Sequence, residues 1–279
     1  MLVLKEITNL KEVYNYHMSF ITPFFFKSSF SKWKESFLND IDGEGRILFK
    51  ELIVKGVYEE DKLLGFIQYG KSSFVFDEEG NISEDNYYQI IRNLYFNNKE
   101  VGTILLNEAL NYFKKEEIIY AFFHYFGMSE FARHGKLFEK HRCVEDLLKE
   151  FNFTIEHENV YYSSIINKIE NSEVEIKSYE LTKGNQQYID FILNDEQVGG
   201  CEIHYVNEKM AYLRWIYVNG NIINKGIGTK CMKALKNYLF KKGITRFDTD
   251  TSINNNLARH YYEKNDFTYE GITRSYYLK

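Results

Sequence analysis

The sequence repeats one succession of segments, and this repetition restricts the possible fold more than any other feature. RNLYFNNKEVGTILLNEALNYFKK, residues 92–115, corresponds to RWIYVNGNIINKGIGTKCMKALKNYLFKK, residues 214–242. The segments on either side also correspond, 63–70 with 197–205 and 149–163 with 263–277. Three matches in the same order predict two copies of one α/β unit, a first domain at residues 1–168 and a second at residues 169–279.

Composition excludes several classes of protein. The 279 residues are 44% hydrophobic, which is enough for two domains with cores, and the net charge of −5 argues against a nucleic-acid partner. Three cysteines fit no metal-ligand spacing and no disulfide framework, so we predict no metal site and a reducing, cytoplasmic location. The charged N-terminus is unlike a signal peptide, and no apolar run approaches the length of a membrane span, so we expect no membrane association.

The second copy reads as a meander of strands followed by alternating helices and strands. Residues 173–181, 187–193, 197–206 and 212–218 alternate like strands, and 244–251 reads as a further strand. Helices are predicted at 227–242, where Gly243 acts as the stop, and at 254–265, and the chain closes with two short strands at 267–270 and 273–278. This order predicts a mixed sheet with helices on its faces, an α/β (α+β) fold.

Two glycines, Gly226 and Gly228, stand between the strand 212–218 and the helix that begins near Ile227. A helix N-terminus presents unpaired N–H groups and a positive dipole end, and therefore binds phosphate. Glycine allows the backbone to approach an anion without interference from a Cβ atom, and Lys225 adds a positive charge. We interpret this loop as a phosphate-binding site.

Residues 218–228, VNGNIINKGIG, resemble the acetyl-CoA pyrophosphate loop of the GCN5-related N-acetyltransferase (GNAT) superfamily. In that family a strand ends in valine and an Arg/Gln-x-x-Gly-x-Gly/Ala segment starts the next helix, with the same spacing from Val218 to Gly228. Ile223 stands where Arg or Gln is usual. The resemblance implies a loop that binds acetyl-CoA through Ile223, Asn224, Lys225, Gly226, Ile227, Gly228 and Thr229.

A second signature of the family follows at the expected distance. Asn255, Ala258, Tyr262-Glu263-Lys264 and Phe267 match the Asn-x-x-Ala helix and its Tyr-Glu-Lys-x-Gly-Phe ending, with Asp266 in place of the glycine. The resemblance implies that this helix lines the pantetheine end of CoA. It also implies two tandem GNAT-like domains, each a mostly antiparallel twisted sheet flanked by helices.

The resemblance implies direct attack of an amine on the thioester of acetyl-CoA. The backbone of Ile216, Tyr217 and Val218 would run along pantetheine, Tyr262 would protonate the leaving sulfur and Asn255 would orient the arm. No general base is evident, because the strand 212–218 has no carboxylate and carries Arg214 in its middle. Four side chains on neighbouring strands remain open as candidates: Glu202, His204, Asp248 and Asp250.

The first copy lacks both the glycine loop and the Asn-x-x-Ala signature. It reads Glu100-Val101-Gly102-Thr103 where the second has Gly226-Ile227-Gly228-Thr229, so a carboxylate stands where the pyrophosphate would bind. Its loop is four residues shorter, and a longer charged helix, about Ser129–Lys149, replaces the Asn-x-x-Ala signature. We therefore expect a degenerate copy that does not bind CoA.

Two functions remain open from the sequence. One is an N-acetyltransferase with a catalytic second copy and an amine acceptor, either a small molecule or a peptide. The other is a non-catalytic acyl-CoA-binding or regulatory module. Residues 1–168 carry a net charge of −6 and residues 169–279 a net charge of +1, which favours a cationic amine as the acceptor.

Overall fold

In the computed structural model, the chain divides into two units that do not coincide with the two sequence copies. The first unit comprises Met1–Asp42, Arg46–Glu158 and Thr273–Lys279, and the second is formed mainly by Asn159–Ile272. The structure describes residues 1–20, 22, 28–42, 45–77, 79–114, 117–131, 134–180, 185–220 and 226–279. The boundary predicted at residue 168 remains a prediction about where the two sequence copies meet. The units of the structure have other limits, because the two copies exchange strands.

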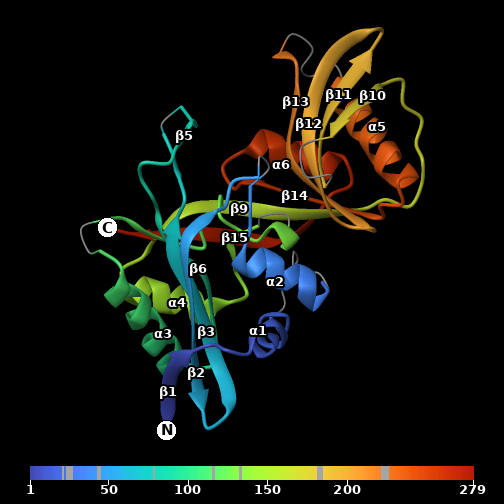
Figure 1. The fold of residues 1–279 in the computed structure, drawn as a ribbon. Helices are drawn as coiled ribbons and strands as arrows, with labels where there is room; N and C mark the ends of the chain where they lie inside the picture. The colour runs from blue at the N-terminus through green and yellow to red at the C-terminus, as the bar shows by residue number, and fades with distance from the viewer. Residues whose placement is uncertain are drawn as a thin grey trace. The chain divides into compact units, whose positions relative to one another are not determined.

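The first unit is a mixed sheet with helices on both faces (Figure 1). Its own strands are β1 (Leu2–Glu6), β2 (Phe49–Glu59), β3 (Lys62–Ser72), β6 (Gln89–Phe96), β7 (Ile119–Ala121) and the short β8 (Leu137–Phe138). A separate hairpin is formed by β4 (Val75–Phe76) and β5 (Ile82–Ser83). The helices are α1 (Leu10–His17), α2 (Phe30–Leu38), α3 (Lys99–Tyr112), the 3-10 turn η1 (Ser129–Phe131) and α4 (Arg142–Glu150).

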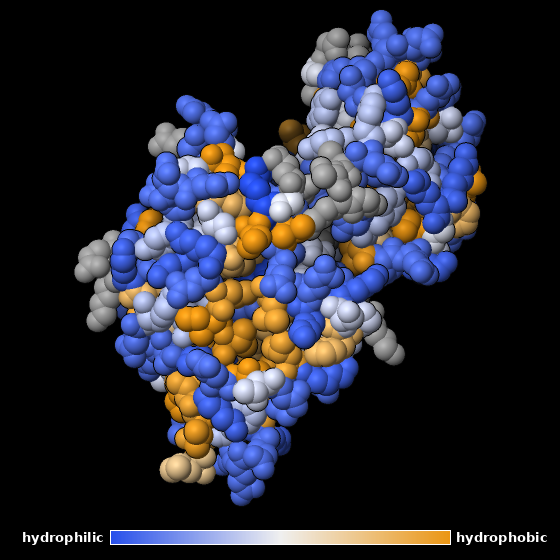
Figure 2. Space-filling view, viewed as in Figure 1, coloured by the Kyte–Doolittle hydropathy of each residue, from blue (hydrophilic) through white to orange (hydrophobic). Residues whose placement is uncertain are grey.

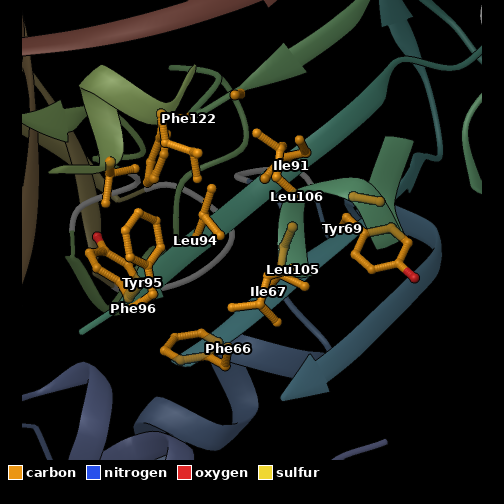
Figure 3. Packing of buried hydrophobic residues seen from close by; sticks show 14 of the residues in the cluster. Phe66, Ile67, Tyr69, Ile91, Leu94, Tyr95, Phe96, Leu105, Leu106 and Phe122 are labelled. Atoms are coloured by element: carbon orange, nitrogen blue, oxygen red, sulfur yellow. The ribbon is translucent and has the colours of Figure 1, made fainter. Parts of the chain in front are cut away.

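The side chains of β3 and β6 are buried on both faces of this sheet. Both strands are buried over nearly their whole length, as expected of central strands between two helical layers. Figure 3 shows side chains of β3, β6 and α3 packed together, among them Ile67, Leu94 and Leu105, all fully buried. In Figure 2, most of the visible surface is hydrophilic, and the largest group of apolar residues lies on this unit.

The second unit is the mixed sheet that the sequence predicts. Its strands and helices are β10 (Glu175–Glu180), β11 (Gln186–Leu193), β12 (Glu196–Asn207), β13 (Met210–Val218), α5 (Ile227–Lys241), β14 (Arg246–Ser252) and α6 (Asn256–Lys264). Neighbouring strands pair antiparallel except β13 with β14, which are parallel. Both helices pack on one face, where Cys231 and Leu235 of α5 and Tyr262 of α6 meet the buried side chains of the strands. Helix α5 ends as predicted, with Gly243 at a φ of +86°.

The two closing strands are exchanged between the units. Strand β9 (Thr154–Ile165) is the last strand of the first copy, yet Asn159–Ile165 pairs antiparallel with β14 of the second unit. Strand β15 (Thr268–Leu278) is the last strand of the second copy, yet Tyr276–Leu278 pairs antiparallel with β7 of the first unit. Each unit is therefore completed by a strand that is distant in sequence from the strand with which it pairs, because Ile165 pairs with Arg246 and Tyr276 pairs with Ala121.

Two sequence predictions are wrong in detail. The two closing strands predicted at 267–270 and 273–278 are one continuous strand, because Gly271, at a φ of +146°, stays within β15 and does not form a turn. The long helix predicted at about Ser129–Lys149 is a 3-10 turn and a short strand, and α4 begins only at Arg142. The chain folds back tightly there, since a Cβ atom at Gly135 would lie 2.7 Å from the carbonyl oxygen of Phe123.

Within the described parts of the chain, no helix combines the length and the apolar character required to cross a membrane.

Because the end of β15 pairs with β7 of the first unit, we predict that it stabilises this unit. Tyr276 is fully buried in the core of that unit, whereas its neighbour Tyr277 is partly exposed. Replacing Tyr276 by Ala should lower the free energy of unfolding of the first unit by about 3–5 kcal/mol, because it leaves a large cavity. Urea denaturation followed by hydrogen exchange measures this loss unit by unit.

Tyr277→Ala is the matched control, and it should have a much smaller effect. Equal destabilisation by the two variants, or a loss confined to the second unit, would contradict the exchange.

Candidate functional site

Strand β13 carries a β-bulge at Arg214. Its register with β12 pairs Trp215 with Glu202 and Leu213 with Ile203, so Arg214 is the extra residue. The parallel pairing of β13 with β14 ends at the same place, at Leu213 and Thr249. Among the described residues, the edge of β13 from Trp215 to Val218 that faces away from β12 has no strand partner. Its backbone groups are therefore available to a ligand.

The N-terminus of α5 follows this open edge. Gly226 is the N-cap residue with a φ of +77°, a conformation that favours glycine, and a Cβ atom there would meet no described atom within 4 Å. No side chain in the described chain caps this helix end. Ile227, Gly228 and Thr229 form the first turn, and the helix dipole makes this end favourable for an anion.

Helix α6 supplies the opposite side of the site. The Oδ1 atom of Asn255 accepts a hydrogen bond from the backbone N–H of Ala258 at 3.1 Å and so caps the helix. Tyr262 follows Ala258 by one turn and is 5% exposed. Burial raises the pKa of Tyr262 to about 12, although contact with Thr249 acts in the opposite direction. The hydroxyl of Tyr262 is therefore protonated at neutral pH.

These three elements enclose a cavity of about 510 Å³. Nine residues predicted from the sequence line it: Ile216, Tyr217, Val218, Gly226, Gly228, Thr229, Asn255, Ala258 and Tyr262. Ile227 is not among the lining residues and packs toward the core of the unit. Ile223, Asn224 and Lys225 lie outside the described residues.

Four further residues line the same cavity and were not predicted, namely Leu257, His260, Tyr261 and Lys264. Tyr261 donates a hydrogen bond to the carbonyl oxygen of Gly228 at 2.7 Å. A Cβ atom at position 228 would lie 3.1 Å from the ring of Tyr261, which explains the glycine. The spacing of Leu257, Tyr261 and Lys264 along one helical face could have revealed them.

A second, basic cavity of about 330 Å³ lies in the same unit, and Thr229 and Lys264 line both cavities. Its lining includes Lys168, Lys233 and Lys236 against the carboxylates of Glu170 and Asp266. The ammonium group of Lys233 is paired with Glu170 at 2.9 Å. The N-terminal end of α5 therefore continues into a lysine-rich surface.

The four candidate bases lie on the sheet face opposite to α5 and α6. Strand register puts His204 beside Tyr212, and Tyr212 beside Asp248. Glu202 is bonded to the ring nitrogens of His204 and Trp215, each at 2.9 Å. Burial raises the pKa of Glu202, but His204 and Arg214 outweigh it and hold the pKa below its ordinary value.

Asp248 and Asp250 share this face two residues apart on β14. Asp248 is fully buried and accepts hydrogen bonds from Arg246 at 2.7 and 2.9 Å and from Tyr161 at 2.8 Å. Burial raises the pKa of Asp248 to about 6 against the opposite effect of Arg246. Asp250 is partly exposed and accepts hydrogen bonds from Tyr212 and from Asn159. Of the two, Asp250 is the one that solvent or a ligand can reach.

In the first unit, protein atoms fill the space beside β6 that corresponds to the cavity beside β13. The bulge residue there is Arg92, and the pairing of β6 with β7 ends at Ile91 and Ala121. The segment after β7 occupies the space beyond and leaves a cavity of about 10 Å³. The side chain of Asn98 caps α3 by accepting from the N–H of Val101, and a Cβ atom at Gly102 would lie 2.7 Å from the ring of Phe96.

One cluster of metal-ligating residue types lies in the first unit, whereas the larger cavity belongs to the second. Potential ligand atoms of His124, Glu156 and His157 lie within 4.8 Å of one another. These groups already contact protein atoms, since Glu156 accepts from Ser275 at 2.7 Å and Nδ1 of His157 lies 2.9 Å from the Glu156 carbonyl oxygen. The absence of a metal cofactor stays a prediction.

Comparison with protein families matches residues 144–267 to the acetyltransferase (GNAT) family. This span contains β13, α5, β14 and α6 and therefore the whole cavity. No curated protein sequence matches the chain significantly.

Solved structures resemble the chain over its whole length at low sequence identity. A tandem GNAT protein from the clavulanic acid biosynthesis pathway has a TM-score of 0.59 at 8% identity, with 100% of this chain and 98% of that one covered. A GCN5-related N-acetyltransferase from Sphaerobacter thermophilus has a TM-score of 0.62 at 6% identity, with 99% and 95% covered.

A third similar structure is a GCN5-related glucosamine N-acetyltransferase region of a fungal multi-domain β-N-acetylglucosaminidase, with a TM-score of 0.66 at 10% identity. All of this chain is covered, but it spans only 38% of the length of the fungal protein. At these identities the similarity establishes the fold, two GNAT-like domains in tandem.

Proposed function

From the match of residues 144–267 to the GNAT family and from the tandem fold, we propose that the chain is an N-acetyltransferase of the GNAT superfamily that transfers the acetyl group of acetyl-CoA to a primary amine. The observation that carries the proposal is the cavity of about 510 Å³, which joins the end of α5 at Gly226 to the edge of β13 and to Tyr262. The acceptor is a small molecule or a peptide.

The residues present suit acetyl-CoA. The N–H groups of the first turn of α5, near Gly226 and Gly228, would bind the pyrophosphate. The open edge of β13 from Ile216 to Val218 would pair with the amide groups of pantetheine, as an added strand does. Lys264, which lines both cavities, would bring the basic surface to the remaining phosphate of CoA.

Acetyl-CoA supplies the acetyl group as a thioester. Side chains of this unit accept a proton from the amine and donate a proton to the leaving sulfur. Asp250 accepts the proton that the amine loses as its nitrogen bonds to the acetyl carbon. Tyr262 donates its proton to the sulfur as the carbon–sulfur bond breaks, which its raised pKa of about 12 allows at neutral pH. The products are the amide and the free thiol of CoA.

Asp250 is the best of the four candidate bases. Asp248 is fully buried and bonded twice to Arg246, and Glu202 and His204 lie on β12, which does not border the point where β13 and β14 separate. Asp250 directly follows Thr249, the last residue of β14 paired with β13 and the residue in contact with Tyr262. It is therefore next to the point where the strands separate.

We also propose a cytoplasmic location, because Cys143, Cys201 and Cys231 are all free thiols. The first unit would bind no CoA, since its corresponding space is reduced to about 10 Å³. Calorimetry would then give one acetyl-CoA per chain.

Gly226→Glu should weaken the binding of acetyl-CoA at least tenfold, about 1.4 kcal/mol, by placing a carboxylate against the pyrophosphate. Because any side chain at a φ of +77° adds strain, Gly226→Asn is the control. Asparagine tolerates this conformation and is neutral, so it should bind acetyl-CoA far better than the Glu variant. Equal affinity of wild type and Gly226→Glu by calorimetry would remove this helix end from the site.

Tyr262→Phe removes only the hydroxyl, so the affinity for acetyl-CoA should be preserved. Turnover should fall by about 10²–10⁴-fold because the leaving sulfur loses its proton donor. The measurement is acceptor-dependent release of the CoA thiol. Turnover within threefold of wild type would leave Tyr262 a packing residue, and thermal stabilisation by CoA without turnover of any amine would indicate the non-catalytic binding module.

Asp250→Asn should lower turnover by about 10²–10⁴-fold at neutral pH without loss of affinity for acetyl-CoA. The deficit should shrink as the pH rises, because the amine then loses its proton to solvent. Asp190→Asn, a change of a carboxylate on β11 that is bonded to Gln197, is the control. A pH–rate profile of Asp250→Asn that runs parallel to that of the wild type would exclude Asp250 as the base.

A further inference from the structure

Each unit carries an arginine at the same structural position. Arg92 and Arg214 are the extra residues of the bulges on β6 and β13, each followed by the open part of its strand. The parallel pairing to the next strand ends one residue earlier in both units, at Ile91 and at Leu213. The two side chains are therefore equivalent, and their surroundings can be compared directly.

In the first unit this arginine binds a carboxylate. The Nη2 atom of Arg92 lies 2.6 Å from Oδ2 of Asp40, and both side chains are only 2% exposed. Its remaining donors reach the carbonyl oxygens of Ser36, Phe126 and Gly127 at 2.8–3.1 Å. Ser36 and Asp40 belong to α2 and to the turn after it. A guanidinium at this position is thus well placed to hold a carboxylate.

In the second unit the same arginine lacks such a partner among the residues that the structure describes. The nearest carboxylate is that of Glu202, whose Oε1 lies 4.0 Å from Nε of Arg214, beyond hydrogen-bonding distance. Both oxygens of Glu202 are already bonded, to His204 and to Trp215. The side chain of Arg214 is 34% exposed. Its planar donors are therefore available to a ligand.

Arg214 also lies close to Tyr262, the residue proposed to protonate the leaving sulfur during acetyl transfer. Its neighbour Leu213 accepts a hydrogen bond from Thr249, which contacts the hydroxyl of Tyr262. Tyr212, two residues before Arg214 on β13, donates a hydrogen bond to Asp250, which places this carboxylate near the bulge. A positive and a negative side chain in one acceptor site suit a ligand that carries both charges.

We propose that the acceptor is an amine that also bears a carboxylate, an amino acid or a peptide-like compound, and that Arg214 binds this carboxylate. The inference rests on the proposed function and narrows its acceptor. The carboxylate of the acceptor takes the place that Asp40 has beside Arg92. The amine end is directed to Asp250.

The test compares matched amines that differ only in the carboxylate: lysine with cadaverine, phenylalanine with phenethylamine, and tyrosine with tyramine. Binding of each to the complex of the protein with CoA is measured by calorimetry, and turnover by release of the CoA thiol with acetyl-CoA. At least one carboxylated member should bind at least tenfold better than its partner. Its KM in the turnover assay should be lower as well.

Arg214→Gln should abolish that preference by weakening the carboxylated member at least tenfold, with unchanged affinity for acetyl-CoA and for the decarboxylated partner. Arg214→Lys should restore part of the preference, because it keeps the charge but not the planar fork. Binding of both members equally, or an equal loss of both in Arg214→Gln, would overturn the inference and leave the acetyltransferase intact. Selective binding without thiol release from any amine would instead count against the proposed reaction while supporting the role of Arg214.

Discussion

The site depends on one constraint, the early end of the parallel pairing between β13 and β14. The extra residue at Arg214 shifts the register of β13 against β12, and beyond Leu213 the strand no longer pairs with β14. Strand edges in a folded core seldom stay without partners, because unpaired N–H and C=O groups are costly when buried. The open edge can therefore pair with a ligand that has amide groups of its own, and α5 and α6 add a helix N-terminus and the hydroxyl of Tyr262 to the same cavity.

The first unit shows how the same framework is closed. Its bulge at Arg92 and its shortened pairing are retained, but protein atoms occupy the space. Phe96 stands against Gly102, Asn98 caps the helix, and Asp40 neutralises the arginine. Side chains of the unit thus fill the positions that we assign to a bound ligand in the second unit. The two copies together show which features belong to the fold and which belong to the site.

Much of this could be predicted from the sequence, for identifiable reasons. The helix of residues 227–241, its stop at Gly243 and the cap at Asn255 are local patterns, and nine predicted residues line one cavity. The exchange of β9 and β15 could not be predicted, because the pairing of strands so distant in sequence has no local signal. The helix expected from Ser129 failed because buried aromatic residues and the close approach at Gly135 override a charged, helix-like pattern. The bulge at Arg214 depends on the neighbouring strand and is likewise invisible in a single segment.

The exchanged strands also affect the order in which the protein can be made. The first unit needs Tyr276–Leu278 beside β7, and these residues are synthesised after the whole second unit. Folding on the ribosome therefore cannot finish the first unit before the second, as it would for two independent domains in a row. Until residue 279 emerges, β7 presents an open edge that a chaperone or another nascent chain can occupy. The first unit is therefore completed last, although its synthesis begins first.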